Sequence, residues 1–214
     1  MTADDVAQKD AVLLAILPEV PFDGWTWKAL RAAAAHAGFE GGDGAELFPE
    51  GPRDLVAWFS HWADRRTLAS LADSKQRRLR TKERIALGVR TRLRLLFPHR
   101  EAVRRASSLL VMPRNLPLGA TLLYDTVDAL WYGAGDISTD FSFYTKRGLL
   151  AAVYATTTLY WLDDRSDDAI ATDEFLDRRL DEVLAIPRLR GAAERLFNPF
   201  QMLRRARSRF SGAE

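Results

Sequence analysis

The residue types that most often carry out catalysis are sparse in this sequence and form no recognisable motif. Cysteine is absent, which excludes a disulfide framework, a thiolate metal site and a cysteine nucleophile. The three histidines, His36, His61 and His99, lie on separate predicted elements, without the H-E-x-x-H or paired E-x-x-H spacing of metal sites. We therefore expect no metal, no other cofactor and no catalytic residue, and the sequence gives no support for an enzyme.

Four neighbouring carboxylates, Asp163, Asp164, Asp167 and Asp168, are the remaining candidates for acid-base chemistry. An enzyme that uses this Asp-rich segment is one alternative, although acidic residues after a helix more often form a solvated loop. The sequence also lacks a G-x-S-x-G elbow, and the glycines of residues 41–44 form an acidic turn that would repel phosphate.

Helical periodicity dominates the chain, and no alternating run rich in Val, Ile and Thr predicts a strand. We expect an all-α protein of one domain plus a tail, because 214 residues with 47% hydrophobic content can form one well-cored domain. The expected helices cover residues 4–17, 25–37, a long segment opened by Pro52, a basic segment capped by Thr81 and ended by Pro98, 118–132, about 141–162, and 172–186 ended by Pro187.

The first three helices resemble the helix-turn-helix headpiece of bacterial repressors, so their charge decides whether they suit DNA. Between Ala32 and Pro52 there is no Lys or Arg, whereas Glu40, Asp43 and Glu46 are present. Phosphates would be repelled from the surface where a groove-reading helix should carry positive charge. We expect no DNA binding, and a ligand-responsive transcriptional regulator remains the alternative function.

The longest uncharged run, residues 148–162, follows an abrupt helix-start signal. The residue types that cap helices precede it at Asp136, Ser138, Thr139 and Asp140. The run has fifteen residues, fewer than the roughly 20 needed to cross a bilayer. Because it is apolar on nearly every side, we expect a core helix that also contributes to a homodimer.

The predicted helix over residues 118–132 has two distinct faces. One face is apolar and should meet the core; it comprises Ala120, Leu123, Val127, Leu130 and Ala134. The other combines aromatic and acidic side chains: Tyr124, Asp125, Asp128, Trp131 and Tyr132. This second face is either packed under a neighbouring helix or a protein-binding patch, because interfaces use aromatic anchors surrounded by polar groups.

Positive charge is concentrated in two segments. Residues 75–105 carry twelve Lys and Arg against Glu83 and Glu101, and residues 188–209 carry seven Arg against Glu194. The first segment is an amphipathic helix whose outer face is either simply solvated or meets an acidic partner or lipid. The second places Phe and Leu opposite Arg, as in a helix on an anionic membrane, although a docked, disordered or partner-binding tail is the alternative.

Several short sequences in fixed order resemble the ubiquinone biosynthesis protein COQ family, member nine. They are Val127-Asp128-Ala129-Leu130-Trp131-Tyr132, Ala134-Gly135-Asp136, Ser138-Thr139-Asp140-Phe141, Tyr144-Thr145-Lys146-Arg147 and Phe175-Leu176-Asp177-Arg178-Arg179. One departure from the family's pattern is Ser142-Phe143, where an Asn-Trp pair is usual.

This resemblance implies a TetR-like all-helical fold that has lost DNA binding, with residues 1–186 as a lipid-binding domain (headpiece 4–65, bundle 66–186) and 187–214 as a basic amphipathic tail. It implies a non-catalytic homodimer that binds an isoprenoid lipid or ubiquinone intermediate and supports the di-iron demethoxyubiquinone hydroxylase. The implied partner surface is Asp128, Trp131 and Tyr132. The implied membrane residues are Leu196, Phe197, Phe200, Leu203 and Arg204.

The acidic start of the chain, MTADDVAQKD, is unlike a secretory signal or an Arg-rich transit peptide. We therefore expect a cytoplasmic or already processed chain. Together with the resemblance, this predicts peripheral association with the inner membrane, from the cytoplasm in a bacterium or from the matrix side in a mitochondrion.

Overall fold

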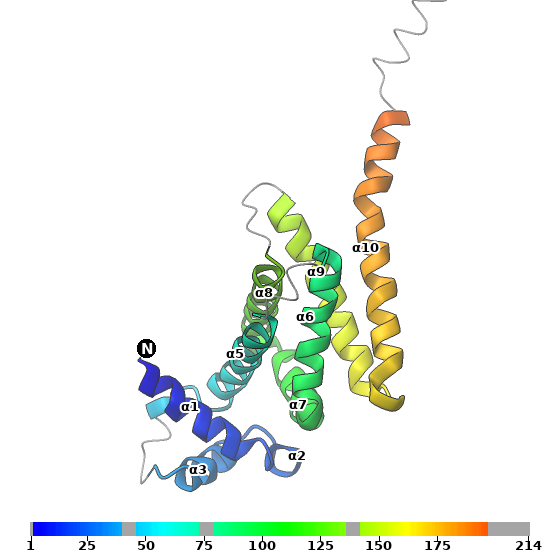
Figure 1. Cartoon of the computed structure of the whole chain (residues 1–214). Helices are drawn as coiled ribbons and strands as arrows, with labels where there is room; N and C mark the ends of the chain where they lie inside the picture. The colour runs from blue at the N-terminus through cyan, green and yellow to red at the C-terminus, as the bar shows by residue number, and fades with distance from the viewer. Residues whose placement is uncertain (1, 40–45, 73–78, 136–141, 197–214) are drawn as a thin grey trace, which may run out of the picture.

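The computed structural model describes residues 2–39, 46–72, 79–135 and 142–196, with side chains described except in 142–146 and 184–196. Over these residues the chain is helical and contains no strand, so the expected all-α class is confirmed (Figure 1). The residues expected to cap the central helix, Asp136, Ser138, Thr139 and Asp140, lie outside the described residues.

Three helices form a headpiece at the N-terminal end: α1 (Ala3–Ile16), α2 (Val20–Asp23) and α3 (Trp27–His36) (Figure 1). A capping box starts α1, because Thr2 Oγ1 accepts from the Asp5 amide and the Asp5 carboxylate accepts from the Thr2 amide. Helices α1 and α3 pack directly on each other. The periodicity did not predict the short helix α2. Pro21 lies in its first turn, and Gly24, with a φ of +68°, follows its last residue as the C-cap.

Helix α5 (Pro52–Leu71) runs through the middle of the molecule and packs against α6 (Thr81–Leu96) and α8 (Leu116–Gly133) (Figure 1). The expected buried stripe of Leu55, Phe59 and Trp62 is confirmed. Helix α5 also buries Trp58, Ala63, Asp64 and Thr67, so it is covered on more than one side. Because α5 has neighbours on several sides, the predicted apolar stripe accounts for only part of its buried surface.

The basic segment is two helices rather than one. Helix α6 begins after Arg80, whose amide donates to the Glu83 carboxylate at 2.8 Å, so the expectation that Thr81 is the N-cap is wrong by one residue. A short 3-10 turn (Phe97–His99) follows α6 and leads into α7 (Arg100–Leu110). Pro98 lacks the amide that would continue α6, which agrees with the expected end there.

Helix α9 (Ser142–Asp163) is the expected central core helix, and α10 (Ile170–Leu196) packs along it. The prediction that Pro187 ends the last helix is wrong, because α10 continues through it to Leu196. The residues before Pro187 are held by packing against α9 and α6, and the later turns extend past the ends of both helices (Figure 1). Distortion at the missing amide would therefore displace neither helix.

Part of the positive charge of α6 faces α10 rather than solvent alone. Arg90 pairs with both Asp173 and Asp177, at 3.2 and 2.7 Å, and Lys82 pairs with Asp181. The acidic face of α10 thus neutralises part of the basic run. Ion pairs of this half-exposed kind contribute little stability each, but they fix which face of α10 meets the bundle.

Candidate functional site

A pocket of about 420 Å³ lies among α5, α6, α7, α8 and α9. Its wall is mainly apolar, as in small-molecule sites of about 300–1,000 Å³. The apolar lining residues are Val56, Phe59, Ala63, Leu96, Val103, Ala106, Leu110, Val111, Leu116, Ala120, Leu122, Leu123, Ala155 and Leu159. A cavity of this size and lining can hold a hydrophobic molecule or part of one.

The sequence analysis placed Ala120 and Leu123 on a core-facing arc of α8. Leu123 is half-buried and packs against the core as expected, but it also lines the pocket, as does the exposed Ala120; Val127 and Leu130 of the same arc are buried. The whole apolar arc of α8 therefore faces the inside of the bundle, but its first turns border the pocket and its later turns border the packed core. Periodicity identifies which side of a helix is apolar, not whether other side chains fill the space opposite.

The two ends of the pocket differ in exposure. At one end large apolar side chains reach solvent: Leu116 is 53% exposed, Leu159 60% and Val111 68%. At the other end the lining residues Arg92, Thr126 and Tyr154 are buried. The pocket thus has an apolar mouth and a closed inner end.

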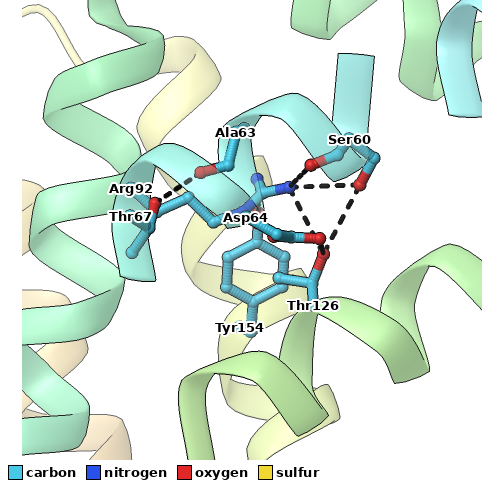
Figure 2. Close-up of polar contacts among 7 residues, drawn as sticks. All are labelled: Ser60, Ala63, Asp64, Thr67, Arg92, Thr126 and Tyr154. Atoms are coloured by element: carbon cyan, nitrogen blue, oxygen red, sulfur yellow. Dashed lines mark hydrogen bonds and ion pairs between the residues drawn. The ribbon is translucent and has the colours of Figure 1, made fainter. Parts of the chain in front are cut away.

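Polar side chains from four helices meet at the inner end, around Arg92 of α6 (Figure 2). Arg92 Nε donates to Asp64 Oδ1 at 2.8 Å, and Nη1 donates to the Tyr154 hydroxyl at 2.5 Å. Arg92 Nη2 lies 3.1 Å from Ser60 Oγ and 3.3 Å from Thr126 Oγ1. Thr126 in turn donates to Asp64 Oδ2 at 3.1 Å, which closes the network.

Burial alone would lower the pKa of Arg92, but Tyr154 and the Asp64 carboxylate outweigh it, so the pKa is raised and the guanidinium stays charged. Burial raises the pKa of the Tyr154 phenol, against the opposing effects of Arg92 and the Thr158 hydroxyl. Tyr154 is therefore a neutral phenol beside a charge-balanced ion pair. The inner end is polar but carries no net charge.

The sequence analysis missed this network, although α6 contained a signal for it. At 100° per residue, Arg92 lies directly beside the arc of Ile85, Val89 and Leu96, all three of which are buried. An arginine on the apolar face of a helix must find buried partners, because an unpaired buried charge is too costly. Asp64 and Tyr154 carry no comparable local signal.

The residues of the predicted partner surface lie close together but differ in exposure. Tyr132 is 71% exposed, whereas Trp131 is only 7% exposed and belongs to the core. Asp128 is half-exposed and accepts from Arg147 Nε and Nη2, at 2.7 and 2.6 Å. The expectation that Trp131 shares the solvent face of α8 is wrong, because this position borders the apolar arc of Val127 and Leu130.

The predicted membrane residues Phe197, Phe200, Leu203 and Arg204 lie outside the described residues. Leu196 is the last residue of α10, and its side chain is likewise not described. Among the described helices, none is both long enough and apolar enough to span a bilayer.

The Asp-rich segment between α9 and α10 is only partly the solvated loop expected from the sequence. Asp163, Asp167 and Asp168 are exposed, but Asp164 is buried. One Asp164 oxygen accepts from Ser166, and the other accepts from the Thr172 amide at 2.9 Å and from its hydroxyl. Asp164 therefore fixes the turn into α10.

No group of three His, Cys, Asp or Glu side chains among the described residues is arranged to hold a metal ion. His99 is half-buried and packs edge-on against the rings of Phe59 and Trp62, and burial lowers its pKa. A neutral ring in an aromatic cluster is a packing residue. Among the described residues that line the pocket, none is a carboxylate or a histidine.

Residues 116–187 match the family model described as COQ9. The ubiquinone biosynthesis protein COQ9 of Rattus norvegicus, named as mitochondrial, is 36% identical over 181 residues, which are 81% of this chain and 57% of that protein. The Homo sapiens protein of the same name is 34% identical over 81% of this chain and 56% of its own length. This chain thus spans a little over half the length of these relatives.

A TetR transcriptional regulator from Nitrosomonas europaea has a similar structure, with a TM-score of 0.68 and 19% sequence identity. The match covers 83% of this chain and 98% of the regulator. At this identity the likeness establishes the fold alone, and it confirms the expected TetR-like architecture.

Proposed function

We propose, from the premise that this chain belongs to the COQ9 family, that it is a non-catalytic lipid-binding protein of ubiquinone biosynthesis. It takes up an isoprenoid quinone intermediate and presents it to the di-iron hydroxylase that acts on demethoxyubiquinone. The observation that carries the proposal is the apolar pocket of about 420 Å³ with an apolar mouth. An isoprenoid chain is the class of ligand that such a wall desolvates without unpaired polar groups.

The apolar mouth favours a membrane-derived ligand over a water-soluble one. Leu116, Val111 and Leu159 would be costly to leave in water, and contiguous exposed apolar groups mark a contact site for lipid or protein. A ligand that moves from a bilayer through this mouth into the pocket would remain in contact with apolar groups along its whole path. The basic amphipathic tail with Leu196, Phe197, Phe200, Leu203 and Arg204 would hold the protein at the inner membrane during this transfer.

The experiment is to purify the protein from a host that makes ubiquinone, extract it with organic solvent and identify the lipids by mass spectrometry. We expect an isoprenoid quinone or its precursor at a molar ratio close to one per chain. A protein that yields no isoprenoid, and takes none up from vesicles that contain ubiquinone, would contradict the proposal.

The hydroxylase would contact the surface formed by Asp128 and Tyr132, with Trp131 supporting it from below. Tyr132 presents an exposed aromatic ring next to an acidic side chain, the combination that interface anchors use. Removal of the ring in Tyr132→Ala should weaken co-purification of the hydroxylase at least tenfold. Unchanged co-purification would remove this surface from the proposal and leave lipid binding standing.

A transcriptional regulator is the second candidate, because the TetR-like fold is shared with one. The charge of the headpiece argues against it, since the segment from Ala32 to Pro52 carries acidic residues and no basic ones. A gel-shift assay with genomic fragments at moderate salt should give no shifted band. A specific shifted band would favour the regulator.

A further inference from the structure

The inner end of the pocket has a capacity for hydrogen bonding that its own network does not use up. The Tyr154 hydroxyl accepts from Arg92 Nη1 at 2.5 Å, so its own proton is directed elsewhere. Thr158 lies one turn further along α9 and lines the same pocket. Its hydroxyl oxygen is buried and makes no hydrogen bond of normal length within the part of the chain that the structure describes, although it lies near enough to the Tyr154 phenol to lower that group's pKa.

A buried hydroxyl without a full partner costs stability, and most native proteins avoid it. Tyr154 and Thr158 lie one turn apart on α9 and both line the pocket, so one polar atom of a ligand can contact both hydroxyls. The neighbouring Arg92 polarises the phenol and makes Tyr154 a stronger donor than a phenol in an apolar site. The ligand group that satisfies both positions is an oxygen that accepts hydrogen bonds.

The charge of the site defines this oxygen further. Arg92 is already matched by the Asp64 carboxylate at 2.8 Å, and Thr126 occupies the second carboxylate oxygen. An anionic head would therefore add a second negative charge to a site whose one guanidinium is already balanced by Asp64. A neutral carbonyl or ring hydroxyl fits this balance better than the carboxylate of a fatty acid.

We propose that Tyr154, polarised by Arg92, and Thr158 form a subsite for a neutral ring oxygen, so that a quinone-type head binds at the inner end of the pocket. The isoprenoid chain then leaves through the mouth between Leu116 and Leu159, where the wall is apolar and exposed. This inference rests on the proposed function and adds the orientation of the ligand. It also assigns recognition of the head to side chains that the sequence motifs do not include.

Two probes separate recognition of the head from burial of the chain: ubiquinone with two isoprene units, and farnesene, an isoprenoid hydrocarbon without oxygen. Binding of each to delipidated protein is measured by equilibrium partition. We expect Tyr154→Phe and Thr158→Val each to weaken ubiquinone binding about three- to tenfold, the usual range for one hydrogen bond. Farnesene binding should change less than twofold.

Thr157→Val is the matched control. Thr157 is fully buried on the same helix and its hydroxyl also lacks a hydrogen-bond partner among the described residues, but it does not line the pocket. Its substitution should leave both probes at wild-type affinity. If Tyr154→Phe fails to fold, Thr158→Val still tests the subsite, because Thr158 is not a partner of Arg92 in the network. Thermal melting shows whether each of the three variants is folded.

Wild-type affinity of both variants for ubiquinone would overturn the subsite while the proposed function stands. An equal loss of both probes would also overturn it, because it would indicate a collapsed pocket rather than a lost hydrogen bond. A wild-type protein that binds neither probe would instead contradict the proposed function itself. Decanoate should compete more weakly than the neutral quinone, and stronger competition by decanoate would contradict the charge argument.

Discussion

Arg92 Nε donates to Asp64 Oδ1 at 2.8 Å, and this buried ion pair joins α6 to α5 at the inner end of the pocket. Loss of one partner leaves an uncompensated buried charge, which typically costs about 3–5 kcal/mol. We expect Arg92→Met to lower the free energy of unfolding by an amount in that range, measured by urea denaturation. The double variant Arg92→Met, Asp64→Leu should recover most of the loss. A single variant within about 0.5 kcal/mol of wild type would show that the pair is not desolvated as the structure indicates.

Trp131 and Tyr132 are neighbours in sequence with opposite environments, so they separate stability from recognition. Trp131→Ala removes a core ring and should cost about 3–5 kcal/mol of unfolding free energy. Tyr132→Ala changes an exposed position and should stay within about 0.5 kcal/mol of wild type. Thermal and urea denaturation of the two variants provide the comparison. Equal losses would contradict the different burial of the two rings.

Asp164 should make the stability of the protein depend on pH. Burial opposes its ionisation, but hydrogen bonds from Ser166 and Thr172 outweigh burial and lower its pKa from 3.8 to about 2. Since the pKa is lower in the folded than in the unfolded chain, the stabilisation is complete above about pH 4 and is lost as the pH falls towards 2. Asp164→Ala should therefore lower the unfolding free energy by about 1–2 kcal/mol at pH 7 and by much less near pH 2.

The exposed neighbour Asp163 is the control for this experiment, because it pairs only at the surface with Arg104. Asp163→Ala should show no comparable dependence on pH. A loss in Asp164→Ala that is equally large at both pH values would mean that the side chain acts by packing and not as a charged cap.

Gly51 combines a positive φ of +59° with close approach of the Trp27 ring. A Cβ added at Gly51 would lie 2.4 Å from Trp27 carbons, so Gly51→Ala must displace the ring. Gly38 has φ +87° but no atom within 4 Å of an added Cβ, so Gly38→Ala tests backbone strain alone. We expect about 1 kcal/mol of destabilisation at Gly38 and at least twice that at Gly51 in urea denaturation. Similar values for both would argue against the Trp27 contact.

The helices and much of the core follow from local pattern. Ile85, Val89, Leu93 and Leu96 repeat at helical spacing, and all four are buried as expected. The end of α6 near Pro98 and the beginning of α5 at Pro52 also follow from the loss of an amide at proline. These features depend on neighbours within one or two turns, which is the range that a sequence displays directly.

The pocket and its network depend on contacts that no local pattern contains. Arg92 meets Asp64, Thr126 and Tyr154 across 28 to 62 positions in the sequence. Trp131 was misplaced because its position borders the apolar arc, and the packing of a neighbouring helix decides which side of the border is buried. Pro187 was misread because the turns of α10 that follow it extend past α6 and α9, so distortion at the missing amide displaces neither helix (Figure 1).

The most direct test of the central claim is to fill the pocket and measure the lipid that remains bound. Ala120 lines the pocket but is itself exposed, so Ala120→Phe can occupy the cavity without disturbing the core. Ala35 is an exposed position on α3 that does not line the pocket, and Ala35→Phe is the matched control. We expect isoprenoid lipid per chain, measured by mass spectrometry after extraction, to fall at least fivefold in Ala120→Phe and to stay at the wild-type level in Ala35→Phe. Equal lipid content in all three proteins would show that the ligand, if one is bound, does not occupy this pocket.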